Sequence, residues 1–170
     1  RDYIAVADAV ARPKRDNARV VLTGAFCEQP PLALIKSIEM SGCYIVDDDF
    51  MLVTRLLLDD VPADANPLEE LSKAFLHRSA TTAAKYETTR EEKGVFLLNQ
   101  VKTRGAEGVI FAAPSFCDPA LLERPMLQDV LGKHKVPHTA FKYAENTGQM
   151  APIREQAGTF ADSIKLWSAA

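Results

Sequence analysis

Short apolar runs alternate with segments of helical periodicity along the chain. Four runs are rich in apolar or β-branched residues and are bounded by glycine, proline or polar residues, which is typical of buried parallel strands. They are ARVVLTGAF (18–26), CYIVDDD (43–49), GVIFAAP (108–114) and VPHTAFKY (136–143). Apolar residues at helical spacing predict helices in the segments 29–42, 66–79, 88–105, 118–134 and 152–167.

This alternation predicts an α/β fold built from right-handed βαβ units. We expect a four-stranded parallel sheet of the flavodoxin or Rossmann-like type, flanked by helices. The block 50–104 is longer than a simple crossover and predicts a helical excursion after the second strand. Residues 1–17 are expected to form a helical segment and a linker, and residues 18–170 the α/β domain.

The charge pattern argues against two classes of partner. The net charge is -3, the pI is about 5.6, and lysines and arginines are scattered among acids, so no basic face is offered to nucleic acid or to anionic lipid. No apolar run has the length of a membrane span, and the first residues lack a signal-peptide pattern and an initiator Met. We expect a cytoplasmic protein, or a piece of a longer one.

The expected sheet topology brings two cysteine-containing loops together. In doubly wound sheets, ligands bind beyond the carboxyl ends of the strands where the strand order reverses. With the order 2-1-3-4, the loop GAFCEQPP after the first strand and the loop APSFCDP after the third share one crevice. Cys27 and Cys117 would both face it.

Cys117 has two explanations that the pattern leaves open. Asp118 can cap the following helix and Pro119 can occupy its first turn, so the thiol would lie just outside a helix N-terminus. That position favours the thiolate, which binds metal or attacks an electrophile. The alternative is a cysteine packed as a small apolar side chain.

The other two cysteines carry weaker signals. Cys27 lies in a similar turn, but the neighbouring Glu28 disfavours a thiolate, and Cys43 at a strand entrance is interpreted as structural. Three widely spaced cysteines without a CxxC pair argue against a disulfide framework and against a self-contained zinc module.

Several remaining patterns give little support to common chemistries. The carboxylates of residues 47–49 are interpreted as a solvated turn rather than a cation cage, because alternate strand residues point apart. The loop with Gly148 and Gln149 could hold an anion or be an ordinary turn. The three histidines show no metal-ligand spacing. The sequence has no P-loop, no GxGxxG and no GxSxG, so it predicts no ATP site.

Three stretches together resemble the benzoyl-CoA reductase branch of the 2-hydroxyacyl-CoA dehydratase family. They are TGAFCEQPPLALIKSIEMSGCYIVDDD (23–49), FAAPSFCDPALLERPML (111–127) and KYAENTGQMAPIREQAGTFADSIKLW (142–167). The chain looks like the C-terminal domain of a cluster-bearing subunit, closer to the one called C than to the one called B, without its N-terminal domain.

The resemblance implies a low-potential, dearomatising reduction. It implies a 4Fe-4S cluster with Cys117 as one ligand and the remaining cysteine ligands outside this chain. It also implies a heterotetramer of anaerobic aromatic degradation, in which a related cluster-bearing subunit helps to enclose benzoyl-CoA. A separate pair of ATP-hydrolysing subunits would deliver electrons from ferredoxin, and the product would be cyclohexadienoyl-CoA.

The same resemblance places four residues near the substrate. Cys27 and Glu28 belong to the loop GAFCEQPP, and Gly148 and Gln149 belong to a turn that is taken to line the acyl-CoA site. No catalytic residue or ring-protonating group is assigned. The alternatives are a 2-hydroxyacyl-CoA dehydratase subunit, and a non-catalytic flavodoxin-like binding domain with three structural cysteines.

Overall fold

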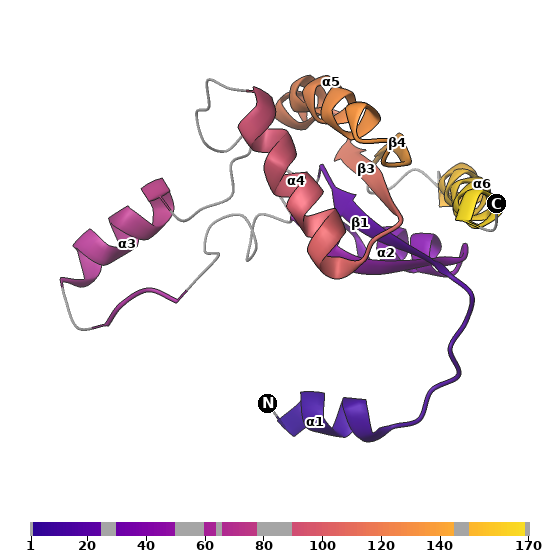
Figure 1. Cartoon of the computed structure of the whole chain (residues 1–170), viewed down its shortest axis with the longest axis horizontal. Helices are drawn as coiled ribbons and strands as arrows, with labels where there is room; N and C mark the ends of the chain where they lie inside the picture. The colour runs from indigo at the N-terminus through magenta and orange to yellow at the C-terminus, as the bar shows by residue number, and fades with distance from the viewer. Residues whose placement is uncertain are drawn as a thin grey trace.

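A parallel sheet of four strands, in the order β2-β1-β3-β4, forms the centre of the computed structural model (Figure 1). The structure describes residues 2–24, 30–49, 60–63, 66–77, 90–144 and 150–168. The strands are β1 Ala18–Thr23, β2 Cys43–Asp48, β3 Gly108–Pro114 and β4 His138–Tyr143. The predicted fold class, the parallel pairing and the strand order are confirmed.

Helices cover both faces of the sheet. Helices α2 and α6 lie on one face and α4 and α5 on the other, whereas α1 and α3 lie apart from the sheet (Figure 1). Helix α3 belongs to the predicted excursion after β2, and the first part of that excursion, residues 50–59, lies outside the described residues. The helices are α1 Asp2–Ala9, α2 Leu32–Glu39, α3 Pro67–His77, α4 Arg90–Arg104, α5 Asp118–Lys133 and α6 Met150–Ser168.

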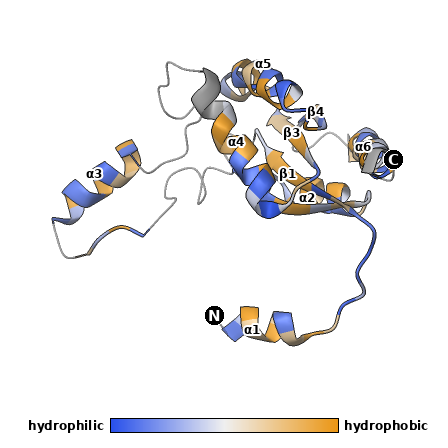
Figure 2. Cartoon of the chain, viewed as in Figure 1, coloured by the Kyte–Doolittle hydropathy of each residue, from blue (hydrophilic) through white to orange (hydrophobic). Residues whose placement is uncertain are grey.

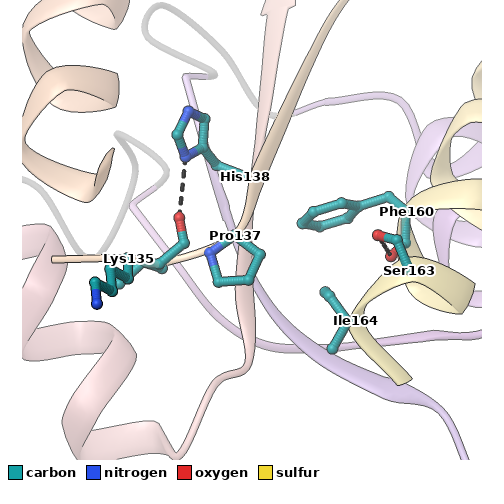
Figure 3. A pocket seen from close by; sticks show the side chains of 7 residues that line it. Lys135, Pro137, His138, Phe160, Ser163 and Ile164 are labelled. Atoms are coloured by element: carbon teal, nitrogen blue, oxygen red, sulfur yellow. Dashed lines mark hydrogen bonds between the residues drawn. The ribbon is translucent and has the colours of Figure 1, made fainter. Parts of the chain in front are cut away.

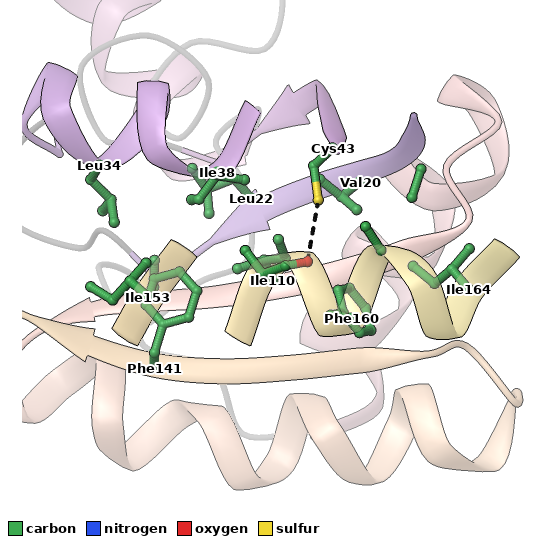
Figure 4. Packing of buried hydrophobic residues seen from close by; sticks show 14 of the residues in the cluster. Val20, Leu22, Leu34, Ile38, Cys43, Ile110, Phe141, Ile153, Phe160 and Ile164 are labelled. Carbon is green, nitrogen blue, oxygen red and sulfur yellow. Dashed lines mark hydrogen bonds between the residues drawn. The ribbon is translucent and has the colours of Figure 1, made fainter. Parts of the chain in front are cut away.

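The core has two main layers, one on each face of the sheet. Under α2 and α6, Val20, Leu22 and Ile110 of the strands pack against Ile38 and Ile153 of the helices (Figure 4). Val21, Val109 and Phe111 point to the other face, against apolar residues of α4 and α5. The central strands β1 and β3 are therefore apolar on both faces, which explains why they form nearly continuous apolar runs in the sequence. Figure 2 colours much of both strands as hydrophobic.

The pairing of β2 with β1 shifts by one residue halfway along the strands. Val20 pairs with Ile45, but Val21 pairs with Asp47, so Val46 is left out of the ladder. Paired residues of neighbouring strands face the same side, and Asp47 therefore points to the α4 side. There its carboxylate accepts a hydrogen bond of 2.9 Å from Nε of Arg104.

The interpretation of residues 47–49 as a solvated turn is wrong for Asp49. Its side chain is only 5% exposed, and Oδ2 accepts a hydrogen bond of 2.5 Å from Oγ1 of Thr23. The reason is that the ends of β1 and β2 lie side by side, so a carboxylate that follows β2 meets the last residue of β1. Buried carboxylates need such donors.

Candidate functional site

The carboxyl ends of β1 and β3 meet at the predicted switch point of the sheet. Thr23, the last residue of β1, pairs with Phe111 of β3. The chain then leaves β1 through Gly24, whose φ of +100° is one that residues with a Cβ rarely adopt. A Cβ at this position would also lie 3.2 Å from the carbonyl oxygen of Ala112. The loop after β1 therefore starts in close contact with the backbone of β3.

Cys117 lies at the same edge, in the turn between β3 and α5. It is the N-cap residue of α5, and its carbonyl accepts a hydrogen bond of 3.1 Å from the N–H of Leu121. The expectation that Asp118 caps the helix is wrong by one residue, because the turn Pro114–Cys117 closes earlier and puts Asp118 at the first helical position. Pro119 occupies the first turn as predicted.

The surroundings of Cys117 are small and apolar. The residue is 6% exposed and packs in a cluster with Ala113 of β3 and Ala120 of α5, with Leu121 against it. The side chain of Cys117 does not itself cap the first turn of α5. The thiol thus lies at the positive end of the helix dipole, in a setting that excludes most water.

The turn that carries Cys117 is hydrogen-bonded to β4. Ser115 donates twice to the carbonyl oxygen of Tyr143, from its backbone N–H at 2.8 Å and from Oγ at 3.0 Å. The N–H of Cys117 donates to the carbonyl of Pro114 at 3.1 Å. Ser115 stands inside the loop APSFCDP, but no spacing in the sequence signalled its contact with Tyr143, 28 residues away.

Cys43 lies at the opposite end of the sheet, as its place at the entrance of β2 predicted. It is fully buried between β2 and α6, and Sγ is 3.9 Å from the carbonyl oxygen of Ala157, to which it donates a weak hydrogen bond (Figure 4). Burial raises the pKa of the Cys43 thiol to about 11, although nearby Lys165 lowers it and Glu39 adds to the rise. A protonated, buried thiol is neither a nucleophile nor a metal ligand at neutral pH.

The four residues predicted to lie near the substrate all fall outside the described residues. Cys27 and Glu28 belong to residues 25–29, and Gly148 and Gln149 to residues 145–149. The described positions just before these two gaps, Gly24 and Ala144, follow β1 and β4 at the carboxyl edge of the sheet. The assignment of the four residues stays a prediction.

Cys117, at this edge of the sheet, fits one ligand position of a metal cluster. Within the described parts of the chain, no three His, Cys, Asp or Glu side chains come together as a metal site. Iron-sulfur clusters are held by several thiolates, and Cys117 could supply one of them. The sulfur of a cysteine is the atom that such clusters bind, and Cys117 places one at the start of α5.

Two hollows in the described surface lie elsewhere. One of about 390 Å³ lies between the start of β4 and α6, and is lined by Lys135, His138, Phe160 and Ser163 among others (Figure 3). A second of about 280 Å³ lies between α4 and α5. The first is at the amino end of β4, away from Cys117, and the sequence patterns had indicated neither.

Within the described ranges, no helix combines the length and the apolar character that crossing a bilayer requires.

Comparisons with known proteins give the family. The model of the family "2-hydroxyglutaryl-CoA dehydratase, D-component" matches residues 2–164. The benzoyl-CoA reductase of Thauera aromatica has a subunit, the one called C, that is 67% identical over 99% of this chain and 44% of its own length. The beta subunit of (R)-2-hydroxyglutaryl-CoA dehydratase from Acidaminococcus fermentans is 28% identical, over 89% of this chain and 40% of its own length.

A third relative is the beta subunit of (R)-phenyllactyl-CoA dehydratase from Clostridium sporogenes, which is 27% identical over 88% of this chain and 38% of its own length. The chain thus spans less than half the length of these relatives. The match of the family model over nearly every residue shows that the chain belongs to the 2-hydroxyglutaryl-CoA dehydratase D-component family.

Proposed function

We propose that this chain is part of a cluster-bearing subunit of an ATP-dependent, ferredoxin-linked benzoyl-CoA reductase, equivalent to the one called C in Thauera aromatica. The observation that supports this most is the 67% identity to that reductase subunit over 168 residues. The dehydratase subunits reach only 24% to 28% over similar lengths. So large a difference favours the reductase branch over the rest of the family.

The proposed reaction adds two electrons and two protons to the aromatic ring of benzoyl-CoA and gives cyclohexadienoyl-CoA. A bound 4Fe-4S cluster would supply electrons of low potential for this reduction. Cys117 is the proposed ligand from this chain, and the other cysteine ligands would come from polypeptide outside it. Ala113, Ala120 and Leu121 pack around Cys117 and limit the access of water to its thiol.

The substrate would bind in the crevice beyond the carboxyl ends of β1, β3 and β4. The loops with Cys27 and Glu28 and with Gly148 and Gln149 are proposed to line it. A related cluster-bearing subunit would complete the enclosure. Two ATP-hydrolysing subunits would drive electrons from ferredoxin, in keeping with a sequence that has no P-loop. The cytoplasm is the proposed location.

The test uses the complete subunit as it is encoded, purified anaerobically with its partner subunits. Iron and sulfide analysis and electron paramagnetic resonance measure the cluster, and chromatography of acyl-CoA esters follows the conversion of benzoyl-CoA. We expect Cys117→Ala to abolish the cluster signal of this subunit. Cys43→Ala is the matched control and should keep the signal, because Cys43 lies at the opposite end of the sheet.

Three outcomes would contradict parts of this proposal. An intact cluster signal in the Cys117→Ala protein would refute the ligand assignment. Dehydration of a 2-hydroxyacyl-CoA without reduction of benzoyl-CoA would favour the dehydratase alternative. A complete wild-type protein without iron would favour the non-catalytic binding domain.

A further inference from the structure

We propose that Ser115 is a positioning residue that fixes the Cys117 turn to the end of β4. The inference rests on the proposed function, because it concerns Cys117 as a cluster ligand. It starts from one carbonyl oxygen, that of Tyr143, which accepts both the backbone N–H and the hydroxyl of Ser115.

The backbone hydrogen bond alone continues the ladder between β3 and β4. Pro114 and Tyr143 are the last paired residues of these strands, and the N–H of Ser115 donates to Tyr143 just beyond them. The hydrogen bond from the Ser115 hydroxyl is not part of the ladder, and it uses the second lone pair of the same carbonyl oxygen. Ser115 is half-buried, so water competes only partly for this bond.

Hydrogen bonds help to hold this turn. Phe116 occupies its tip and is 95% exposed, so the largest side chain of the turn contributes almost no burial. The N–H of Cys117 bonds to Pro114 within the turn, and the cysteine itself packs against two alanines. The hydroxyl of Ser115 is thus a side-chain contact that joins the turn to the neighbouring strand.

The position of Tyr143 gives the contact its functional meaning. Tyr143 ends β4, and the predicted acyl-CoA loop with Gly148 and Gln149 follows after Ala144. The carbonyl of Tyr143 belongs to the last pair of β3 with β4, so the hydroxyl of Ser115 holds the Cys117 turn against the carboxyl edge of the sheet. The hydroxyl therefore fixes the proposed cluster ligand relative to the edge beyond which the substrate is proposed to bind.

The experiment compares three variants of the complete subunit, purified anaerobically with its partners. Ser115→Ala removes the hydroxyl, and Ser115→Thr keeps it. Ser163→Ala is the matched control, since Oγ of Ser163 also donates to a backbone carbonyl, that of Phe160 at 2.7 Å, but on α6. The first readout is the rate at which a ferrous chelator removes iron. The second is the change in the paramagnetic resonance spectrum of the reduced cluster when benzoyl-CoA is added.

Residues that orient metal ligands typically alter affinity by about 10-fold or more when they are removed. We expect Ser115→Ala to lose iron about 10-fold faster than wild type and to show a smaller spectral change with benzoyl-CoA. Ser115→Thr should restore both readouts, and Ser163→Ala should match wild type in both.

The results separate this inference from the proposed function. If the wild-type protein holds no iron, the proposed function itself fails. If the wild-type protein holds the cluster and Ser115→Ala matches it in both readouts, only the role of Ser115 is refuted. Equal effects of Ser115→Ala and Ser163→Ala would also refute it, because they would show a general loss of stability.

Discussion

Raising the pH tests whether Cys43 is a structural thiol. Its pKa in the folded protein is about 11, against an ordinary value of 9.0, and burial is the main cause. Between pH 9 and pH 11 the unfolded chain therefore loses the proton of this thiol while the folded chain keeps it. The stability that the buried thiol contributes is fully present below about pH 9 and is lost as the pH rises toward 11.

The size of the loss follows from the difference between the two pKa values. One pKa unit corresponds to about 1.4 kcal/mol, so a rise of about two units predicts a full loss of about 3 kcal/mol from the free energy of unfolding, of which about 2 kcal/mol is reached at pH 11. Tyrosines and lysines titrate in the same range, so the quantity to compare is the difference between wild type and Cys43→Ala. Urea unfolding at about pH 8 and about pH 11 measures it for both proteins. Parallel pH dependences of the two proteins would refute the reasoning.

Alkylation gives an independent readout of the same thiol. At pH 8 a pKa of about 11 leaves roughly 0.1% of Cys43 as thiolate, and the side chain has no exposed surface. Iodoacetamide followed by peptide mass spectrometry should label Cys43 only after unfolding in urea. Labelling of the native protein within minutes under the same conditions would contradict the structure around β2 and α6.

Two further predictions concern packing and a buried hydrogen bond, each measured by thermal or urea unfolding. Gly94→Ala in α4 should lower stability, because the added Cβ would lie 2.5 Å from Cγ1 of Val130. Overpacking of this kind costs about 1–3 kcal/mol. This cost outweighs the gain in helix propensity, which is about 1 kcal/mol. Gly132→Ala in α5 meets nothing within 4 Å and should be neutral or stabilising; the reverse order would contradict the packing of α4 on α5. Thr23→Val removes a hydrogen-bond donor to the buried carboxylate of Asp49 and should lower the free energy of unfolding by about 1–3 kcal/mol. Thr23→Ser keeps the hydroxyl and should cost less. Equal losses in the two variants would show that the hydroxyl contributes nothing.

The alternation of apolar runs and helical periodicity was enough to predict the sheet. The central strands β1 and β3 carry apolar residues on both faces, so their pattern is strong, and the right-handed βαβ connection limits the possible orders of the strands. The same reasoning placed Cys117 at the carboxyl edge and Cys43 at the opposite end. These positions depend only on where each residue stands relative to its strand, which local patterns encode well.

Contacts between distant segments could not be read from local patterns. Cys117 caps α5 because the turn after Pro114 closes by backbone hydrogen bonds, while Asp118 has the side chain that statistics favour for a cap. Asp49 is buried because Thr23 lies beside it, and that neighbour is 26 residues away. The family resemblance added what no pattern in this chain contains, the expectation of a cluster whose other ligands lie elsewhere.

Val46, which has no partner in the ladder between β1 and β2, marks a position where the strand can lose a residue. Because Val46 has no partner in β1, Ile45 and Asp47 pair with consecutive residues of that strand. Removing Val46 would make the pairing regular without turning the acidic end of β2 to the other face of the sheet. In a strand without such a spare residue, a deletion would turn every later side chain over. The sheet can therefore accept the deletion of one residue at this point of β2.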